Sequence, residues 1–202
     1  MLEVRDISHF YGKEKILDNI SFKLPRGSFT ILTGESGSGK TTLLSIVSTL
    51  LLQSEGTIIF HNTPKCSIDT MRNRHIGFIF QFHYLIEHLT VMENIKMVTK
   101  KSKREILKLL ATLNIDTLAH RYPSQISGGQ RQRVAIARAI VNEPKYLFAD
   151  EPTGNLDSKN SKIIFDILRS IKATTLVVTH DSSLILEDDR ILTMRDGQLI
   201  KG

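Results

Sequence analysis

The sequence predicts an α/β fold with a mainly parallel sheet and a group of inserted helices. Apolar runs at 28–34, 146–150 and 174–180 each end abruptly in glycine or polar residues, as buried strands do. Helical patterns follow the first run and precede the third, and this strand–loop–helix alternation implies parallel strands. We therefore expect the polar residues that end these strands to meet at one edge of the sheet, where such folds bind their ligands.

The first sixty residues are rich in short runs of β-branched and aromatic residues, separated by turns. These runs predict strands at 2–10, 17–24 and 56–60. A helix is expected to begin near Lys40, directly after the glycine loop. The apolar run 43–52 predicts that this helix is buried, since it is only about half the length needed to cross a bilayer.

The second half of the chain is richer in helical patterns. Residues 84–115 show mostly such patterns, with a helix at 102–114, and apolar residues at helical spacing predict another at 158–171. The basic run 100–104 is interpreted as the solvated face of a helix in preference to a dedicated anion patch. An Asp-Gly pair in the segment 190–200 predicts a hairpin turn.

Length and composition indicate one domain, residues 1–202, with a helical subdomain at approximately 84–140. The net charge of +6 favours anionic ligands such as nucleotides, nucleic acid or an anionic membrane surface. Cys66 is the single cysteine, which excludes an internal disulfide or a cysteine-based zinc site and fits a reducing compartment. The N-terminal residues lack the apolar core of a signal peptide, so work at a membrane would require an anchor from another protein.

The segment GESGSGKTT, residues 34–42, has the spacing of a phosphate-binding loop between a strand and a helix. Its glycines let successive backbone N–H groups surround a polyphosphate, and the N-terminus of the helix adds a favourable dipole. Lys40 would contact the β- and γ-phosphates, and the Thr41 hydroxyl would bind Mg²⁺. The alternative is a chance glycine-rich turn. The predicted phosphate-binding residues are Gly34, Ser36, Gly37, Ser38, Gly39, Lys40, Thr41 and Thr42.

Two further strand ends carry residues suited to hydrolysis. Asp150 would hold Mg²⁺, and Glu151 would act as general base on the attacking water. Acidic pairs at strand ends are mostly structural when they stand alone, but a phosphate loop nearby favours the catalytic interpretation. His180 ends another inner strand, where it could hydrogen-bond to a γ-phosphate and align Glu151 with the water.

Gln81 follows the apolar run 76–80, and its neutral amide could coordinate Mg²⁺ and water without adding charge. Tyr11 offers a flat face for a base to stack on, although an ordinary turn aromatic is an equally good interpretation. The stretch SQISGGQRQR, residues 124–133, contains a second glycine pair ahead of a helix. Such a pair indicates that backbone N–H groups approach something negative, yet the chain already has one phosphate loop.

Taken together and in this order, these segments resemble the nucleotide-binding domain of ABC ATPases over nearly the whole chain. Residues 34–42 are similar to the family's Walker A loop, Gln81 to its Q-loop and residues 146–151 to its Walker B strand. Tyr11 resembles the A-loop aromatic that stacks on adenine. The family's signature sequence is matched by Ser127, Gly128, Gly129 and Gln130, its D-loop by Asp157 and its switch histidine by His180.

The resemblance implies a P-loop NTPase (RecA-like) core, an antiparallel β subdomain and an inserted helical subdomain. It also implies that two chains form a head-to-tail dimer around two ATP molecules with Mg²⁺. Each ATP would lie on one chain's Walker A loop and face the partner chain's signature loop, with Ser127 and Asp157 reaching across. Ile126 stands where leucine is usual and Asn155 where smaller residues are commoner. We expect little effect from the first, and the second fits the subgroup of MacB, LolD and FtsE.

The leading hypothesis is an ATPase subunit of an ABC transporter of that subgroup, bound at the cytoplasmic face of a membrane through a separate permease. ATP binding would close the dimer, and hydrolysis would reopen it to drive export, extraction or force transmission. A soluble ABC ATPase acting on nucleic acid or ribosomes is the alternative, but such proteins usually carry long insertions or tandem domains. A regulatory module without turnover is disfavoured by the complete set of Lys40, Asp150, Glu151 and His180.

Overall fold

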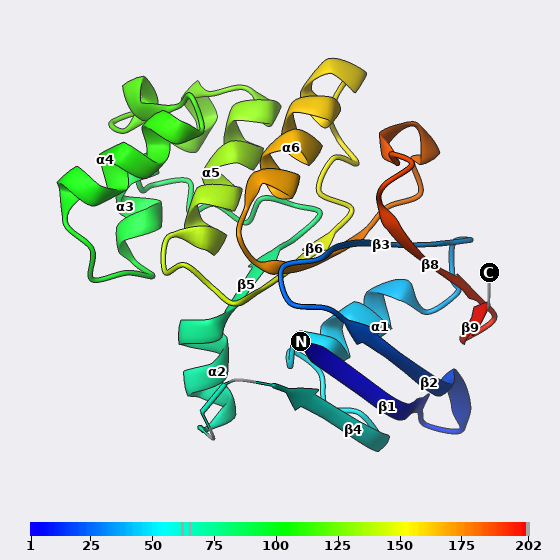
Figure 1. The fold of residues 1–202 in the computed structure, drawn as a ribbon. Helices are drawn as coiled ribbons and strands as arrows, with labels where there is room; N and C mark the ends of the chain where they lie inside the picture. Colours follow the sequence, from blue (N-terminus) through cyan, green and yellow to red (C-terminus); the bar gives the residue numbers. More distant parts are fainter. Residues whose placement is uncertain (62, 65, 201–202) are drawn as a thin grey trace.

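The computed structural model describes residues 1–61, 63–64 and 66–200 and confirms the predicted α/β class. Its larger sheet has six strands in the order β5-β6-β7-β3-β8-β9, parallel except for the last pair (Figure 1). The strands are β3 (Phe29–Gly34), β5 (Ile76–Ile79), β6 (Tyr146–Asp150), β7 (Thr174–Val178), β8 (Arg190–Arg195) and β9 (Gln198–Ile200). The inner strands β3, β6 and β7 are those predicted from the apolar runs, and their carboxyl ends share one edge.

A second, three-stranded antiparallel sheet has the order β2-β1-β4. Its strands are β1 (Leu2–Tyr11), β2 (Glu14–Leu24) and β4 (Glu55–Phe60). On β1, alternating apolar residues point into the core, and Glu3 lies directly opposite Lys23 of β2. This sheet brings the end of β1, with Tyr11, towards the glycine loop after β3.

Helix α1 (Lys40–Val47) lies between the two sheets (Figure 1). Its apolar side chains, including Leu43, Leu44 and Ile46, are fully buried and pack with side chains of both sheets. Burial of one such side chain contributes about 1.5–3 kcal/mol. The glycine loop is therefore held between two well-packed elements, β3 before it and α1 after it.

Helices α5 (Gly128–Ile140) and α6 (Ser158–Ser170) cover the other face of the large sheet (Figure 1). Ile136 of α5 and Phe165 of α6 pack there against buried residues of β3, β6 and β7. Helix α5 also contributes Val134 and Ala137 to a second apolar cluster formed with α3 and α4. Helix α5 thus links the sheet to the helical part of the chain.

That helical part contains α3 (Val91–Lys96), α4 (Lys103–Thr112) and the short 3-10 helices η1 (Asp116–Leu118) and η2 (Pro123–Gln125). Capping boxes start α3 and α4, at Thr90 with Glu93 and at Ser102 with Glu105. Residues 84–140, predicted as an inserted helical subdomain, contain α3, α4 and α5, although α5 packs on the sheet as well.

Three sequence-based expectations about helices hold only in part. The helix from Lys40 ends at Val47, because Thr49 takes a left-handed φ of 66° and turns the chain, so the run 43–52 is helical only in its first half. Residues 84–90 form no helix. The basic run 100–104 lies mostly ahead of α4, since Ser102 is the N-cap of that helix.

One helix went unpredicted and one turn was predicted correctly. Helix α2 (Ile68–His75) has no buried residue, and so it left no apolar period in the sequence. The hairpin at 190–200 is confirmed, with Asp196 and Gly197 both at positive φ between β8 and β9. Within the described residues, no helix is long and apolar enough to span a bilayer, and Cys66 is exposed and free.

Candidate functional site

The loop between β3 and α1 requires glycine at two positions. Gly34 has a φ of 145°, and a Cβ there would lie 2.2 Å from the Met194 carbonyl oxygen. Gly39 has a φ of 95°, and a Cβ there would lie 2.8 Å from Leu17 Cδ2. Strand β8 and strand β2 therefore confine the loop from two sides, which fixes the path of the backbone around the space in front of α1.

Lys40, the first residue of α1, extends back along this loop. Its ammonium donates to the carbonyl oxygens of Gly34 at 2.9 Å and Glu35 at 2.6 Å, and to Ser38 Oγ at 3.4 Å. The residue is only 8% exposed. The cation is thus held inside the loop, beside the N-terminus of α1, and both features favour a bound phosphate.

Asp150 ends β6 beside the same loop. Thr41 Oγ1 donates to Asp150 Oδ1 at 3.3 Å, which places a hydroxyl and a carboxylate together at the start of α1. Burial raises the pKa of Asp150, and the neighbouring Glu151 carboxylate raises it further, while Thr41 and Lys40 oppose the shift. A buried carboxylate next to a second carboxylate is stabilised by a bound cation.

The Mg²⁺ site predicted at Thr41, Gln81 and Asp150 fits this geometry. All three offer oxygen ligands, which a small hard cation such as Mg²⁺ prefers, and a bound cation would oppose the effects of burial and of Glu151 that raise the pKa of Asp150. Such sites hold Mg²⁺ through one or two protein ligands together with substrate phosphates and water. Gln81, which follows β5 and lines the same cleft as Thr41, would supply a further oxygen ligand.

Glu151 directly follows β6 and adopts a left-handed φ of 44°. Its backbone N–H donates to the Val178 carbonyl at 3.0 Å, which fixes this conformation against the end of β7. The side chain is 15% exposed and its Oε1 lies 2.9 Å from Nδ1 of His180. A non-glycine residue at positive φ costs energy and concentrates at functional sites, so the turn is consistent with a catalytic side chain.

The hydrogen bond also fixes which nitrogen of His180 carries a proton. A carboxylate can only accept, so Nδ1–H donates to Glu151, and Nε2 of a neutral ring is then an acceptor. This contact is compatible with the predicted role of His180 in aligning Glu151. Donation from Nε2 to a γ-phosphate, the other predicted role, requires the doubly protonated ring.

A cleft of about 460 Å³ joins these groups. This nucleotide cleft is lined by Tyr11, Ile16, Gly34, Ser36, Gly37, Gly39, Lys40, Thr41, Thr42, Gln81, Glu151, Val178 and His180. The structure thus brings together most of the residues predicted from the P-loop, strand ends, Gln81 and Tyr11. Ser38 and Asp150 lie just behind the lining, in contact with Lys40 and Thr41. Ile16 and Val178 were not predicted, because an apolar residue in a strand gives no signal of a ligand contact.

The signature residues begin α5. Ser127 is the N-cap, and its Oγ accepts from the Gln130 N–H at 3.3 Å while Gln130 Oε1 accepts from the Ser127 N–H at 2.8 Å. This capping box leaves the Ser127 hydroxyl hydrogen available to a ligand. A Cβ on Gly128 would make only ordinary contact, 3.6 Å from Leu156 Cδ2. The N-terminal end of α5 therefore presents the exposed Ser127 and Gly128, and a serine hydroxyl at the start of a helix suits an anion. We call residues 127–130 the signature end of α5.

Asp157 is joined to the signature residues of its own chain through Asn160. The Asp157 carboxylate caps α6, accepting from the Asn160 N–H at 2.9 Å and from its Nδ2 at 2.7 Å. A Cβ on Gly129 would lie 2.8 Å from Asn160 Oδ1. These contacts hold the residues of the predicted D-loop and signature loop as one unit.

A second set of contacts ties the segment after Gln81 to α5. His83 Nε2 lies 3.1 Å from the Gly128 carbonyl, and the guanidinium of Arg138 donates to the carbonyls of His83 and Tyr84, both at 2.7 Å. Burial lowers the pKa of His83 and of Arg138. Neither His83 nor Arg138 was predicted from the sequence. An arginine among the apolar residues of α5 was the available signal.

Within the described residues, the nucleotide cleft is lined by neither the signature residues 127–130 nor Asp157. Gly128 instead borders a separate hollow of about 410 Å³ with the 82–85 segment, Arg131 and Asn155. The chain therefore presents two groups of predicted nucleotide ligands at two different places.

Comparison with known proteins agrees with this arrangement. The family model for ABC transporters matches residues 17–154. The chain is 41% identical over 210 residues to the lipoprotein-releasing system ATP-binding protein LolD of Buchnera aphidicola, covering 95% of this chain and 92% of the relative. It is 39% identical over 225 residues to LolD 2 of Chlorobaculum tepidum, covering 98% and 91%.

Solved structures show the same fold. The dimeric ABC transporter cassette MJ0796 matches with a TM-score of 0.88 and 33% identity, covering 100% of this chain and 97% of that one. A post-hydrolysis dimer of MJ0796 bound to ADP and Pi matches with a TM-score of 0.87 and 32% identity over the same shares. The family match, the identities and the nucleotide cleft lead to one conclusion: the chain belongs to the ABC transporter family, as an ATP-binding and ATP-hydrolysing cassette.

Proposed function

We propose that this ATPase powers the release of lipoproteins from a membrane, working as a head-to-tail dimer with Mg²⁺-ATP beneath a separate permease. The relatives named above are lipoprotein-releasing ATP-binding proteins that align with this chain over nearly its whole length. Residues 149–158, which run from the end of β6 into the site, and residues 81–95 resemble the same subgroup. Lipoprotein extraction is thus the form of transport best supported for this chain.

The dimer is supported by one observation: the predicted nucleotide ligands in the cleft lie apart from those at residues 127–130 and Asp157. The nucleotide cleft supplies the loop amides, Lys40, Glu151 and His180, but within the described chain no signature residue lines it. A second copy placed head to tail would present its Ser127 and the start of its α5 to the γ-phosphate on the first copy. The two solved MJ0796 cassettes are dimers, and one of them contains ADP and Pi.

Binding in the cleft follows from the geometry above. Lys40 would exchange the Gly34 and Glu35 carbonyls for phosphate oxygens, the loop amides would surround the phosphates, and Tyr11 would stack on adenine. Thr41, Asp150 and Gln81 would hold Mg²⁺, which when bound neutralises charge on the β- and γ-phosphates. Each of these groups already faces the cleft or lies directly behind its lining.

Hydrolysis would be carried out by Glu151. Its carboxylate would take the proton of a water whose oxygen forms a bond to the γ-phosphorus while the bond to the β–γ bridging oxygen breaks. His180 would hold the carboxylate in place through the 2.9 Å hydrogen bond. Ser127 and the start of α5 of the partner chain would stabilise the charge on the γ-phosphate from the opposite side.

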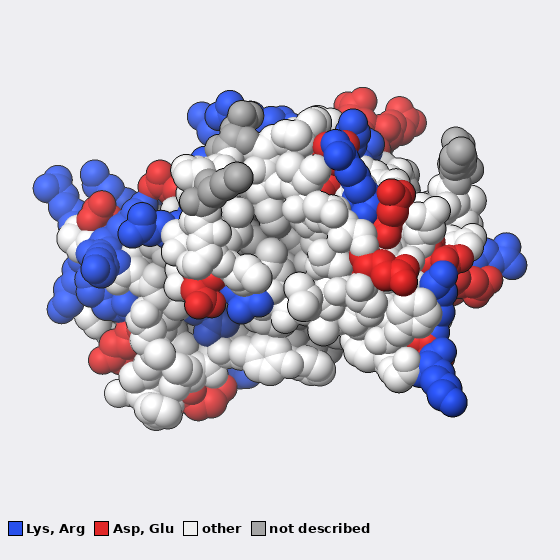
Figure 2. Space-filling model, turned by 90° about the horizontal axis from the view of Figure 1, so that it is seen from below, with Lys and Arg blue, Asp and Glu red and all other residues white. Residues whose placement is uncertain are grey.

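The permease is assigned to the side of the molecule where α2 lies. Figure 2 shows few charged side chains in the middle of this face, whereas Lys and Arg lie around its margins, most densely at the left. A groove of about 520 Å³ lies between α2, β5 and the end of α5. Its lining includes four exposed apolar residues, Leu50, Phe80, Met97 and Val98.

A groove whose lining combines exposed apolar residues with Arg72, Arg74 and Arg138 suits a short amphipathic helical segment of another protein. It lies beside the 80–84 segment, which Arg138 joins to α5. Docking of a permease loop there would couple conformational changes of the permease to the signature end of α5. It would also hold the chain peripherally at the cytoplasmic face of the membrane.

The first test replaces the general base. Glu151→Gln should lower steady-state ATP hydrolysis by about a hundredfold or more while the nucleotide still binds, because the amide cannot accept the proton of water. Static light scattering of the variant should show a dimer with ATP and a monomer without it. Hydrolysis at the wild-type rate would contradict the assignment of Glu151.

The second test concerns the partner. An affinity-tagged chain carrying Glu151→Gln, isolated from detergent-solubilised membranes of its own organism with ATP present, should retain an integral membrane protein in a fixed ratio. Mass spectrometry of the complex would identify that protein. Recovery with ribosomes or nucleic acid in place of a membrane protein would contradict the transporter assignment and support the alternative class.

A further inference from the structure

The residues around Tyr11 contain a buried histidine that neither the family match nor the relatives' names assign. His9 lies two residues before Tyr11 on β1, so both side chains are on the same face of the strand. His9 is 6% exposed, whereas Tyr11 is 54% exposed and lines the nucleotide cleft. The two rings meet edge to face, with centroids 4.9 Å apart and planes at 89°.

The orientation of His9 is fixed from the side away from Tyr11. Its Nδ1 lies 3.3 Å from Ser54 Oγ, and the same oxygen accepts from the Phe10 N–H at 3.2 Å. Ser54 precedes β4, so the end of β1 is joined to its neighbouring strand at this point. A buried ring held in this way is a rigid support, because its rotation would break the bond to Ser54.

The other ring nitrogen, Nε2, is buried and has no hydrogen-bond partner among the described residues. Unpaired buried polar atoms are costly, so a purely structural position would be served better by an apolar ring. An imidazole with its edge or face against Tyr11 instead interacts with the ring of the tyrosine, whose face is electron-rich.

We propose that His9 is a positioning residue for the base of the nucleotide. It holds the exposed Tyr11 ring perpendicular to its own plane and thereby presents one face of the tyrosine to the adenine. His9 does not touch the phosphates, which lie on the loop of residues 34–42. This proposal rests on the assignment of Tyr11 as the base-stacking residue under the proposed function.

The test separates base binding from phosphate binding. Calorimetric titration of the monomer with ATP is compared with displacement of ATP by inorganic tripolyphosphate, which has no base. His9→Ala should weaken ATP binding about three- to tenfold, the range expected for loss of one edge-to-face aromatic pair. Tripolyphosphate binding should not change. In hydrolysis assays the variant should raise KM and leave kcat near the wild-type value.

Two further variants make the result specific. His9→Phe keeps an aromatic ring against Tyr11 and should restore most of the ATP affinity. In the background of Tyr11→Ala, His9→Ala should have no additional effect, because the ring that it positions is gone. Thermal unfolding of each variant shows whether the β1 end still folds.

Each contrary result overturns a distinct claim. Equal weakening of ATP and tripolyphosphate, unchanged ATP affinity in His9→Ala, or additive losses in the double variant would overturn the role of His9. Unchanged ATP affinity in Tyr11→Ala would instead overturn the assignment of Tyr11 itself, and with it the inference that depends on it.

Discussion

The nucleotide cleft and the signature end of α5 are built in opposite ways. In the cleft, Lys40 is held by carbonyls only five and six residues away, and the proposed catalytic residues Glu151 and His180 follow the adjacent parallel strands β6 and β7. At the signature end, Ser127 caps its own helix, but the surrounding loop is held by distant residues. Its contacts are with His83, 45 residues away, and with Asn160 of α6.

This difference indicates which of the two sites needs a second chain in order to contact a phosphate. The cleft is complete on its phosphate side within one chain, since loop, cation and carboxylates converge on one space of about 460 Å³. The signature end is equally well ordered by its neighbours, yet it has no phosphate loop of its own. A helix start that is rigidly held and presented outward is suited to act on a ligand bound by another copy.

The largest effect on stability is expected from removal of Arg138, which holds the signature end to the 80–84 segment. Arg138→Ala should lower the free energy of unfolding by about 1–3 kcal/mol, because the part-buried carbonyl of His83 and the exposed carbonyl of Tyr84 lose a charged donor. Urea denaturation measures this change. Arg133→Ala on the same helix removes a half-buried arginine for which the described structure gives no bonding partner, and should cost much less. Equal losses of stability in the two variants would show that the hydrogen bonds from Arg138 to His83 and Tyr84 contribute nothing.

A smaller and more local effect distinguishes the two signature glycines. Gly129→Ala should destabilise the chain by about 1 kcal/mol, since its Cβ would collide with Asn160 Oδ1 at 2.8 Å and disturb the cap at Asp157. Gly128→Ala is the matched control. Its Cβ meets Leu156 at 3.6 Å, and alanine is the better helix former, so stability should be unchanged or slightly higher. The opposite order would contradict the described contact between α5 and α6.

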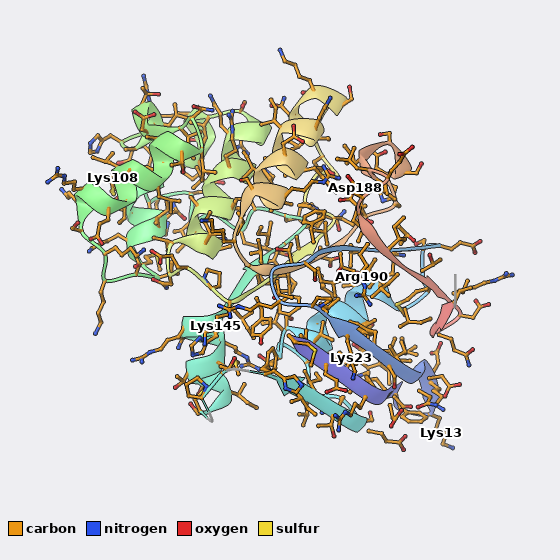
Figure 3. All side chains as sticks on the ribbon, viewed as in Figure 1. Lys13, Lys23, Lys108, Lys145, Asp188 and Arg190 are labelled. Atoms are coloured by element: carbon orange, nitrogen blue, oxygen red, sulfur yellow. The ribbon has the colours of Figure 1, made fainter. Side chains whose placement is uncertain are left out.

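The smallest effect concerns the antiparallel sheet that carries Tyr11. Figure 3 shows Lys23 on this sheet, and its ammonium lies 3.0 Å from the Glu3 carboxylate. Hydrogen bonds from Arg5, Lys23 and His61 lower the pKa of Glu3 from its ordinary 4.5 to about 2. Because the folded chain binds this proton less readily than the unfolded chain, the stabilisation is present above pH 4.5 and is lost as the pH falls towards 2.

Glu3→Gln removes the contribution of Glu3 to the pH dependence of stability. The wild-type chain should be more stable than the variant at neutral pH, and the difference in urea midpoint should shrink as the pH falls below about 4.5. ATP binding at neutral pH should be altered only through the stability of the sheet. A difference that stays constant down to pH 3, or grows, would contradict the pKa assigned to Glu3.

Much of the cleft could be predicted from the sequence because its groups are local or stand at strand ends. The spacing from Gly34 to Thr42 specifies the loop, and apolar runs that end in Asp150 and His180 place those side chains at one edge of a parallel sheet. The predicted hairpin near Gly197 was confirmed for a similar reason, since two residues at positive φ define the turn.

The contacts that organise the signature end could not be predicted in this way. His83 and Arg138 act through tertiary packing of a loop on a helix, and one sequence shows no period or spacing that joins them. Helix α2 was missed because it buries no residue, and α1 was predicted too long because Thr49 takes a left-handed conformation that its residue type disfavours.

The central claim, that each nucleotide needs the cleft of one chain and the signature end of another, is tested most directly by mixing two inactive variants. Lys40→Ala removes the cleft's phosphate ligand, and Ser127→Arg blocks the signature end while leaving ATP binding to the monomer intact. Each variant alone should hydrolyse ATP at background rates.

In an equal mixture, a dimer of one chain of each kind contains one composite site with both an intact Lys40 and an intact Ser127. Random pairing makes half of the dimers mixed, each with one working site of two, so the mixture should regain up to about a quarter of wild-type hydrolysis. The rate should rise with total protein concentration. A mixture that stays as inactive as its two components would show that Lys40 and Ser127 act within the same chain, and would contradict the account.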